Sequence, residues 1–126
     1  MKQEYKELLL KDLCARLPYN IISKVEFRES GEYKSKNMFL SGVFTDEAYF
    51  TTKGGSIYSN EYKPYLFPLS SMTEEQEKEY NNLNCYELGC FPHSEEALDY
   101  LTKNHFDYRH LIEKGLAIDA TGLNIY

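Results

Sequence analysis

No stretch of this chain is long and apolar enough to cross a membrane, and the chain has no tryptophan. A membrane-spanning helix needs about 20 mostly apolar residues in succession, whereas charges interrupt every apolar run here. The first residues, MKQEYKELLLKDL, also lack the apolar centre and the small-residue cleavage site of a secretory signal. We therefore expect a cytoplasmic protein that has no contact with membranes.

Cysteine and positive charge are both scarce. The three cysteines are an odd number, so they fit the reduced thiols of a cytosolic protein better than a disulfide framework. Fourteen basic residues against 20 acidic residues give a net charge of −6. Because phosphate backbones attract positive charge, direct nucleic-acid binding is disfavoured. Acidity permits a protein that mimics DNA, but the charge is modest and the acids are dispersed.

Tyrosine, in contrast, is abundant, and 12 Tyr and 7 Phe make up 15 % of the chain. A chain of 126 residues suits one compact domain and is short for two. Tyrosine combines apolar area with a hydroxyl group, which suits protein interfaces and also the surfaces of sheets. We predict a single α+β domain over residues 1–126, and both roles of the tyrosines stay open.

The first predicted element is a helix over residues 3–17. Apolar side chains at spacings of three and four form one stripe, made up of Leu9, Leu10, Leu13, Cys14 and Leu17. Charged residues, including Asp12 and Arg16, take the other face, which we expect to face water. Cys14 is expected to be a small buried apolar residue. Pro18 ends the helix sharply.

The hydrophobic period then changes from about 3.6 to about 2, which is typical of half-buried strands. Four strands are predicted, near residues 20–29, 37–44, 48–53 and 56–58. Turn signals separate them, and Gly54-Gly55 is the strongest hairpin signal among these. Links this short join antiparallel neighbours. The sequence therefore predicts an antiparallel β-meander of three to five strands.

After the meander, Pro64 and Pro68 are predicted to lead an extended segment out of the sheet. Thr73 and Gln76 match a capping box at the start of a polar helix over residues 73–82.

Two more helices are predicted, over residues 94–104 and 107–114. Asp107 is expected to cap the second of them and Gly115 to end it. Residues 116–118 are expected to return as a strand beside the meander. In the predicted fold, the C-terminal helices pack on one face of the sheet.

Cys85, Cys90 and His93 are the best candidates for a metal site. Thiolate and imidazole groups bind zinc, and the spacing lets a loop fold around an ion. These are three of the four ligands needed, and His105, His110 or an acid would have to be the fourth. The set is weak, so we predict no metal and no cofactor.

No residue pattern in the chain is typical of an active site. Cysteines and histidines occur, but no motif places a base beside a sulfur atom. The pairs Glu74-Glu75 and Glu95-Glu96 stand at predicted helix starts, where the helix dipole already accounts for them. We therefore predict that the protein is not an enzyme and has no catalytic residue.

Three segments of the chain carry a resemblance: KELLLKDLCARLPY at 6–19, KPYLFPLSSMTEE at 63–75 and HFDYRHLIEKGLAI at 105–118. They look like segments of small uncharacterised proteins encoded by gut anaerobic bacteria and by their phages and mobile elements. The resemblance implies an intracellular, phage- or prophage-linked protein. It transfers no catalytic residue, because none is defined in that group. The run holding the metal candidates varies among similar proteins, which weakens a metal site.

The leading hypothesis is a non-enzymatic binding or adaptor protein that acts on another protein, in phage–host regulation or counter-defence. Its predicted contact surface consists of Tyr62, Tyr65 and Phe67. The flanking prolines hold this segment extended, so its aromatic side chains would lose little entropy on binding. Large aromatic side chains are usually buried, however. The other interpretation is therefore that Tyr65 and Phe67 pin the segment to the core.

Two alternative functions stay open. The first is a small-ligand or nucleotide-binding protein that sequesters its ligand in a pocket at the sheet–helix edge near Arg109 and His110. The second is a minor DNA-binding regulator, because the predicted helices 94–104 and 107–114 resemble a helix-turn-helix with Arg109, His110 and Lys114 on its second helix. The acidic charge of the chain counts against the second alternative.

Overall fold

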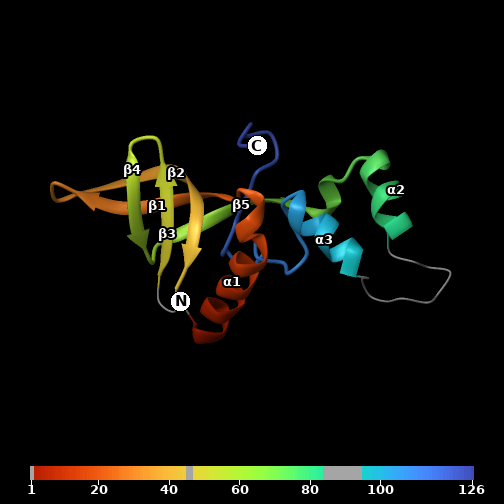
Figure 1. Ribbon diagram of the computed structural model, residues 1–126, viewed down its shortest axis with the longest axis horizontal. Helices are drawn as coiled ribbons and strands as arrows, with labels where there is room; N and C mark the ends of the chain where they lie inside the picture. The colour runs from red at the N-terminus through yellow and green to blue at the C-terminus, as the bar shows by residue number, and fades with distance from the viewer. Residues whose placement is uncertain (1, 45–46, 84–94) are drawn as a thin grey trace.

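The computed structural model describes residues 2–44, 47–83 and 95–126, and its class is α+β, as predicted. Its elements are, in order, α1 (Gln3–Arg16), η1 (Leu17–Tyr19), β1 (Ile22–Glu29), β2 (Glu32–Val43), β3 (Ala48–Thr52), β4 (Gly55–Ser59), β5 (Tyr62–Pro68), η2 (Leu69–Ser71), α2 (Glu74–Leu83), α3 (Glu95–Lys103), β6 (Phe106–Asp107) and β7 (Ile118–Asp119). In Figure 1, β1 to β4 lie at one end, α2 and α3 at the other, and α1 between them. Over the described ranges, no helix has both the length and the apolar composition needed to cross a membrane.

The four strands β1 to β4 form the predicted antiparallel meander, in the spatial order β4-β3-β2-β1. Ser30 and Gly31 join β1 to β2 with φ values of 53° and 81°. A two-residue turn needs this left-handed geometry at both positions to match the twist of its strands. The register between β2 and β3 shifts between Leu40 and Gly42, so β2 contains a bulge.

The predicted count of three to five strands is too low, because the sheet has seven strands within the described residues alone. β5 pairs with β1 in antiparallel orientation and with β6 and β7 in parallel orientation. β6 and β7 are two residues long, which is too short for a hydrophobic period to predict. β7 begins at Ile118, the last residue of the strand predicted over 116–118.

The prediction that Pro64 and Pro68 lead out of the sheet is wrong, since both belong to β5. Pro64 lies opposite Ser23 of β1. The N–H of Glu26 donates to the carbonyl oxygen of Glu61, the residue before β5, at 2.9 Å. The backbone groups of every second β1 residue therefore point toward β5, and those of Ser23 point toward β2. Pro64 therefore occupies a position where β5 makes no ladder hydrogen bond to β1. Its missing N–H costs no hydrogen bond between these two strands.

The predicted helix over residues 107–114 does not form. Its first residue, Asp107, belongs to β6, and the following residues form turns. The Asp107 carboxylate accepts hydrogen bonds from the N–H groups of Leu111 and Ile112, both at 2.9 Å, as a helix cap would. His110, however, has a φ of 58°, which a continuous right-handed helix excludes.

The inward face of α1 carries Leu9, Asp12, Leu13 and Arg16. Their spacing of three and four residues places them on one side of the helix. The expectation that Asp12 and Arg16 face water is wrong, because both side chains are fully buried. Cys14, expected to be buried, is exposed. It lies roughly 100° around the helix from Leu13 and so falls outside the buried face.

The core lies between α1 and the inner face of the sheet. Leu9 and Leu13 pack there with inward-facing strand residues, which include Val25, Leu40 and Phe50. Residues from the last part of the chain complete this cluster: Leu111, Leu116 and Ala117. α3 packs against β6 and α1, and α2 packs against α3, so these two helices stand beside the end of the sheet (Figure 1).

A buried group of charges connects α1 to the C-terminal part of the chain. Asp12 Oδ2 accepts a hydrogen bond from Arg16 Nε at 2.7 Å, and Asp12 Oδ1 accepts one from Arg109 Nη1 at 2.8 Å. Arg16 Nη2 donates to the carbonyl oxygen of Phe106 at 2.6 Å. The guanidinium groups of both arginines lie over the ring of Tyr108. We call Asp12, Arg16, Tyr108 and Arg109 the Asp12 cluster.

We predict that Asp12→Asn lowers the free energy of unfolding by about 3 kcal/mol or more, because removing one partner of a buried ion pair leaves the other charge uncompensated. Urea denaturation followed by circular dichroism measures this. Lys11→Gln is the matched control, since Lys11 is exposed on the same helix and should change stability by less than about 0.5 kcal/mol. Equal effects of the two substitutions would contradict the role of the cluster.

Candidate functional site

The structure does not bring Tyr62, Tyr65 and Phe67 together on one open surface. Successive residues of a strand point to opposite faces, so Tyr62 faces the core side of β5, where its ring lies 5.1 Å from the Phe50 ring. Burial raises the pKa of Tyr62. Tyr65 is 7 % exposed, and its hydroxyl group donates to Asn37 Oδ1 at 2.8 Å.

Arg109 and His110, the predicted ligand-binding pair, contact different parts of the chain. Arg109 belongs to the Asp12 cluster. The His110 side chain is exposed, and its Nδ1 lies 3.8 Å from Glu113 Oε1. The metal candidates Cys85, Cys90 and His93 lie outside the described residues. In the part of the chain that is described, no three His, Cys, Asp or Glu side chains gather as a metal site would require.

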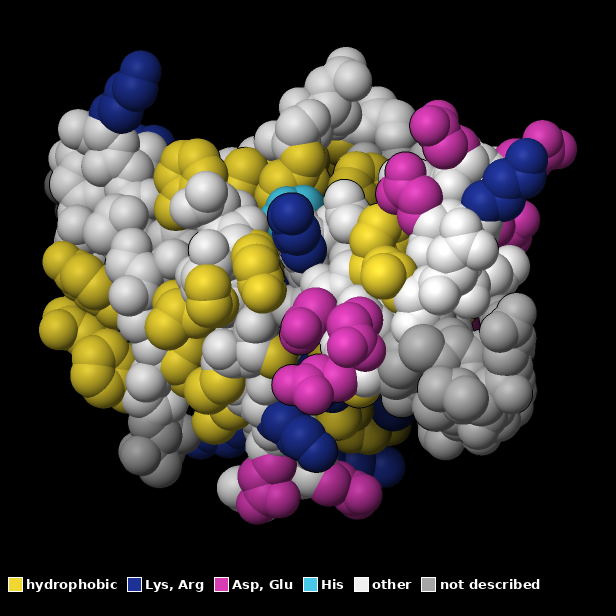
Figure 2. Space-filling view, turned by 45° about the vertical axis from the view of Figure 1, so that its right-hand side comes forward, with side chains coloured by type: hydrophobic (Ala, Val, Ile, Leu, Met, Phe, Trp, Pro, Cys, Tyr) yellow, Lys and Arg dark blue, Asp and Glu magenta, His cyan; other side chains and the backbone are white. Residues whose placement is uncertain are grey.

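Three aromatic side chains gather on the outer face of the sheet, away from α1 and the core. Tyr49 of β3 lies opposite Tyr58 of β4, with ring centroids 4.7 Å apart, and Phe44 lies 5.6 Å from Tyr58. Tyr58 is 57 % exposed and Phe44 50 %. We call Phe44, Tyr49 and Tyr58 the aromatic patch. Hydrophobic side chains gather over this strand-rich side in Figure 2.

The bulge in β2 positions the aromatic patch. The bulge shifts the alternation of inward and outward side chains by one residue. Phe44, which follows β2, therefore points outward, on the same face as Tyr49 of β3. A Cβ atom at Gly42 would lie 3.5 Å from Phe44 Cε2 and 3.6 Å from Tyr49 Cβ, so both side chains border the space that glycine leaves open. The backbone N–H of Phe44 donates to Glu47 O at 2.9 Å, which holds the residue after β2 beside the residue before β3.

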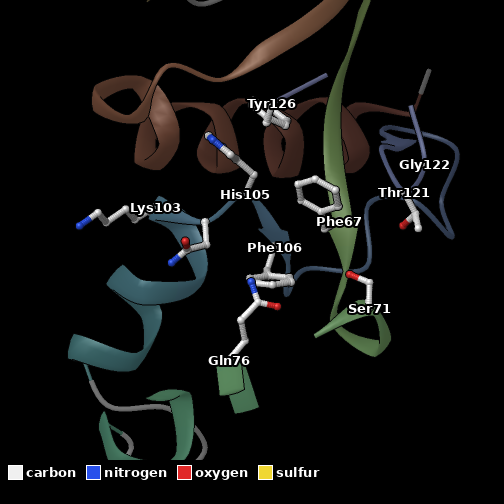
Figure 3. A pocket seen from close by; sticks show the side chains of 10 residues that line it. Phe67, Ser71, Gln76, Lys103, His105, Phe106, Thr121, Gly122 and Tyr126 are labelled. Atoms are coloured by element: carbon white, nitrogen blue, oxygen red, sulfur yellow. The ribbon is translucent and has the colours of Figure 1, made fainter. Parts of the chain in front are cut away.

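A separate cleft of about 420 Å³ lies between β5, the end of α3, β6 and the last residues of the chain. In Figure 3 the rings of Phe67, Phe106 and Tyr126 surround its centre, with Ser71 and Thr121 on one side and Lys103 on the other. Two polar groups of this cleft already have structural partners. Ser71 Oγ donates to Pro68 O at 2.6 Å, and Gln76 Oε1 accepts a hydrogen bond from the N–H of Thr73 at 2.9 Å.

His105 lines the same cleft and is held uncharged at neutral pH. Its ring stacks on the Tyr126 ring with centroids 3.8 Å apart and an interplanar angle of 14°. Its Nδ1 is buried and has no hydrogen-bond partner within the described residues. Burial, together with the smaller effect of the positive charge of Arg16, lowers the pKa of His105 to about 4. This neutral, stacked ring supports the wall of the cleft.

The hydroxyl group of Tyr126 connects β1 to β5. It accepts a hydrogen bond from the N–H of Ile22 at 2.9 Å and donates to Tyr65 O at 2.8 Å. Ser23 pairs with Pro64, so Ile22 and Tyr65 would be the next pair in this register. The tyrosine hydroxyl therefore bridges the two strands at the point where their ladder ends. This residue of the cleft thus has a structural role.

Compared with known proteins, the chain matches no family model, no curated protein sequence and no solved structure. The case for a function therefore depends on the residues described above. Among the described residues, the rings of the aromatic patch have ring contacts only with each other, whereas Ser71, Gln76 and the rings of the cleft take part in folding contacts. The patch is the stronger candidate site.

We predict that Tyr126→Phe lowers the free energy of unfolding by about 1 kcal/mol, because the backbone groups of Ile22 and Tyr65 lose the hydroxyl group that they share. The amide hydrogen of Ile22 should also exchange faster with solvent. Tyr33→Phe removes a hydroxyl group from a side chain that is 59 % exposed and should leave stability unchanged. Unchanged Ile22 exchange in Tyr126→Phe would rule out the bridge.

His105 should make stability depend on pH. Its pKa is about 4 in the folded chain against an ordinary 6.5, so the unfolded chain takes up a proton first as the pH falls. Stability is therefore full above pH ~6.5 and declines toward pH ~4, by about 1–2 kcal/mol from this group. His105→Asn should remove this part of the decline, since Asn tolerates the φ of 64° at this position.

The control for this experiment is His110→Asn, which replaces a second histidine with positive φ, 58°, whose side chain is exposed. Urea denaturation at pH 7 and pH 4.5 should show the same decline in His110→Asn as in the unmodified chain. If His105→Asn declines as steeply as both, the histidine does not carry the effect.

Proposed function

We propose that this chain is a non-enzymatic binding protein that recognises another protein through the aromatic patch. The observation that supports this most is the exposure of Tyr58 and Phe44, 57 % and 50 %, within one group of touching rings. Exposed aromatic side chains that gather on a rigid surface are typical of protein-contact sites, where tyrosine is enriched.

The strands beneath the patch favour tight binding. Tyr49 and Tyr58 form a cross-strand pair, and Phe44 packs against Tyr58. Rings that already restrict one another lose little side-chain entropy when a partner covers them. Each Å² of apolar area that the partner buries would then contribute about 25 cal/mol to binding before other losses are counted. Little of this gain would be lost in ordering the rings.

The setting of this function stays a proposal as well. The resemblance of the chain to phage- and mobile-element-encoded proteins favours a partner in the bacterial cytoplasm, and regulation or counter-defence as the purpose of binding. The DNA-binding alternative loses its main support, because residues 107–114 do not form the helix that would be the recognition helix. The cleft beside Lys103 keeps the small-ligand alternative open, with Phe67, Phe106 and Tyr126 as its apolar wall.

Tyr58→Ser should weaken binding to the partner at least tenfold, because the ring is the most exposed member of the patch. A photo-cross-linking residue at position 58, in the bacterium that carries the gene, would identify the partner. Calorimetry with the purified partner then gives the affinity of each variant.

Leu123→Ser is the control, since its side chain is 50 % exposed but lies outside the patch. It should bind as the unmodified chain does. Equal affinities for all three proteins, or a cross-link from position 123 as readily as from position 58, would refute the proposed surface.

A further inference from the structure

β4 forms one edge of the sheet, beside the aromatic patch, and part of its backbone is unpaired. Thr52 and Gly55 pair across a two-residue turn, so this pair exchanges hydrogen bonds and the following pairs alternate. The alternation directs the N–H and C=O groups of Ser56 and Tyr58 away from β3. No hydrogen bond from any described residue reaches these four groups.

The sheet curves so strongly that the edge of β4 comes close to β1. Ser59 Oγ lies 3.0 Å from Glu26 O and closes the gap at one end. Beyond this point the backbone groups of Arg28 also point away from β2, because Glu29 and Glu32 exchange hydrogen bonds across their own turn and the ladder alternates from there. No described residue pairs with these groups. We call the gap between residues 26–29 and β4 the seam. Two strand edges with unpaired groups therefore face each other across it.

The seam contains two hollows of about 330 and about 400 Å³, which share Phe27, Arg28 and Ile57 as lining residues. Met38, which is almost fully buried, lines the first hollow, and Tyr58 of the aromatic patch lines the second. The floor of the seam is thus apolar, and its walls present backbone donors and acceptors. One side of the seam continues directly into the patch.

We infer that the partner contributes a single extended segment that pairs with the edge of β4 in the seam, an inference that rests on the proposed function. Backbone groups at every second residue of β4 are matched by the backbone of another strand. In such a strand, alternate side chains point to the same face. One of the two sets of side chains of the segment therefore enters the hollow over Phe27 and Ile57, and we expect this set to be apolar. The segment's other side chains lie toward Tyr58.

The free edge of β4 could instead pair with a strand edge of a second copy of this chain. β1 stands opposite β4 across the seam and touches it through Ser59 and Glu26. A second folded copy would have to bring its whole sheet into this space, where β1 already lies. A single chain needs no such room. The geometry therefore favours a peptide segment of a partner over self-pairing.

A displayed library of random ten-residue peptides, selected on the purified full chain, tests the inference. Enriched peptides should carry apolar residues at alternate positions. When one of them is added as a soluble peptide, the amide hydrogens of Ser56 and Tyr58 should exchange at least tenfold more slowly. Ser56→Pro removes one edge N–H at a position where an edge strand tolerates proline, so the peptide should bind at least tenfold more weakly. Ser56→Ala, which keeps the N–H, should bind within about twofold of the unmodified chain.

Exchange rates in the unmodified chain decide the result even if Ser56→Pro folds poorly. A peptide that loses affinity in Tyr58→Ser but leaves the Ser56 amide unprotected would overturn strand pairing and keep the aromatic patch as the site. A library that yields no binder, or only binders indifferent to both positions, would overturn the patch and the seam together. A dimer in sedimentation that protects the same amides without peptide would overturn the inference in favour of self-pairing.

Discussion

The carboxylate of Asp12 is buried between the guanidinium groups of Arg16 and Arg109, and the structure, over its described ranges, gives neither arginine another carboxylate. Taking these charges out of water costs several kcal/mol for each ion, and only close, hydrogen-bonded contacts offset it. The contacts exist only when α1, β6 and the turns after β6 dock together. The cluster therefore favours one arrangement of these three segments. Arg16 adds a bond to Phe106 O, which fixes β6 beside β5.

This docking determines which surfaces stay open. α1 covers the inner face of the sheet, and the last residues of the chain cover the outer face near β5, where Tyr65 is buried and Tyr126 bridges two strands. The outer face of β2 to β4 and the edge of β4 have no such cover among the described segments. The binding surface predicted around Tyr65 and Phe67 is thus largely occupied by folding contacts, while Phe44 and Tyr58 remain available.

Local signals predicted local structure well. The period-2 alternation gave β1 to β4, and Thr73 and Gln76 form the reciprocal hydrogen bonds of a capping box, at 2.9 and 3.1 Å. Features set by distant partners were beyond such signals. Asp12 is buried because Arg109, almost a hundred residues later, reaches it, and Pro64 fits in a strand because of its register against Ser23. Phe44 faces outward because of a bulge, which alternation alone does not reveal. The aromatic patch was missed for this reason.

A double-mutant cycle between Asp12 and Arg109 tests the central claim most directly. The free energies of unfolding of Asp12→Asn, Arg109→Met and the double variant give the coupling between α1 and the turns after β6. We predict a coupling of about 1 kcal/mol or more, below that of a fully buried pair because Arg109 is partly exposed. Effects that add within about 0.3 kcal/mol would show that the two segments dock independently of this contact.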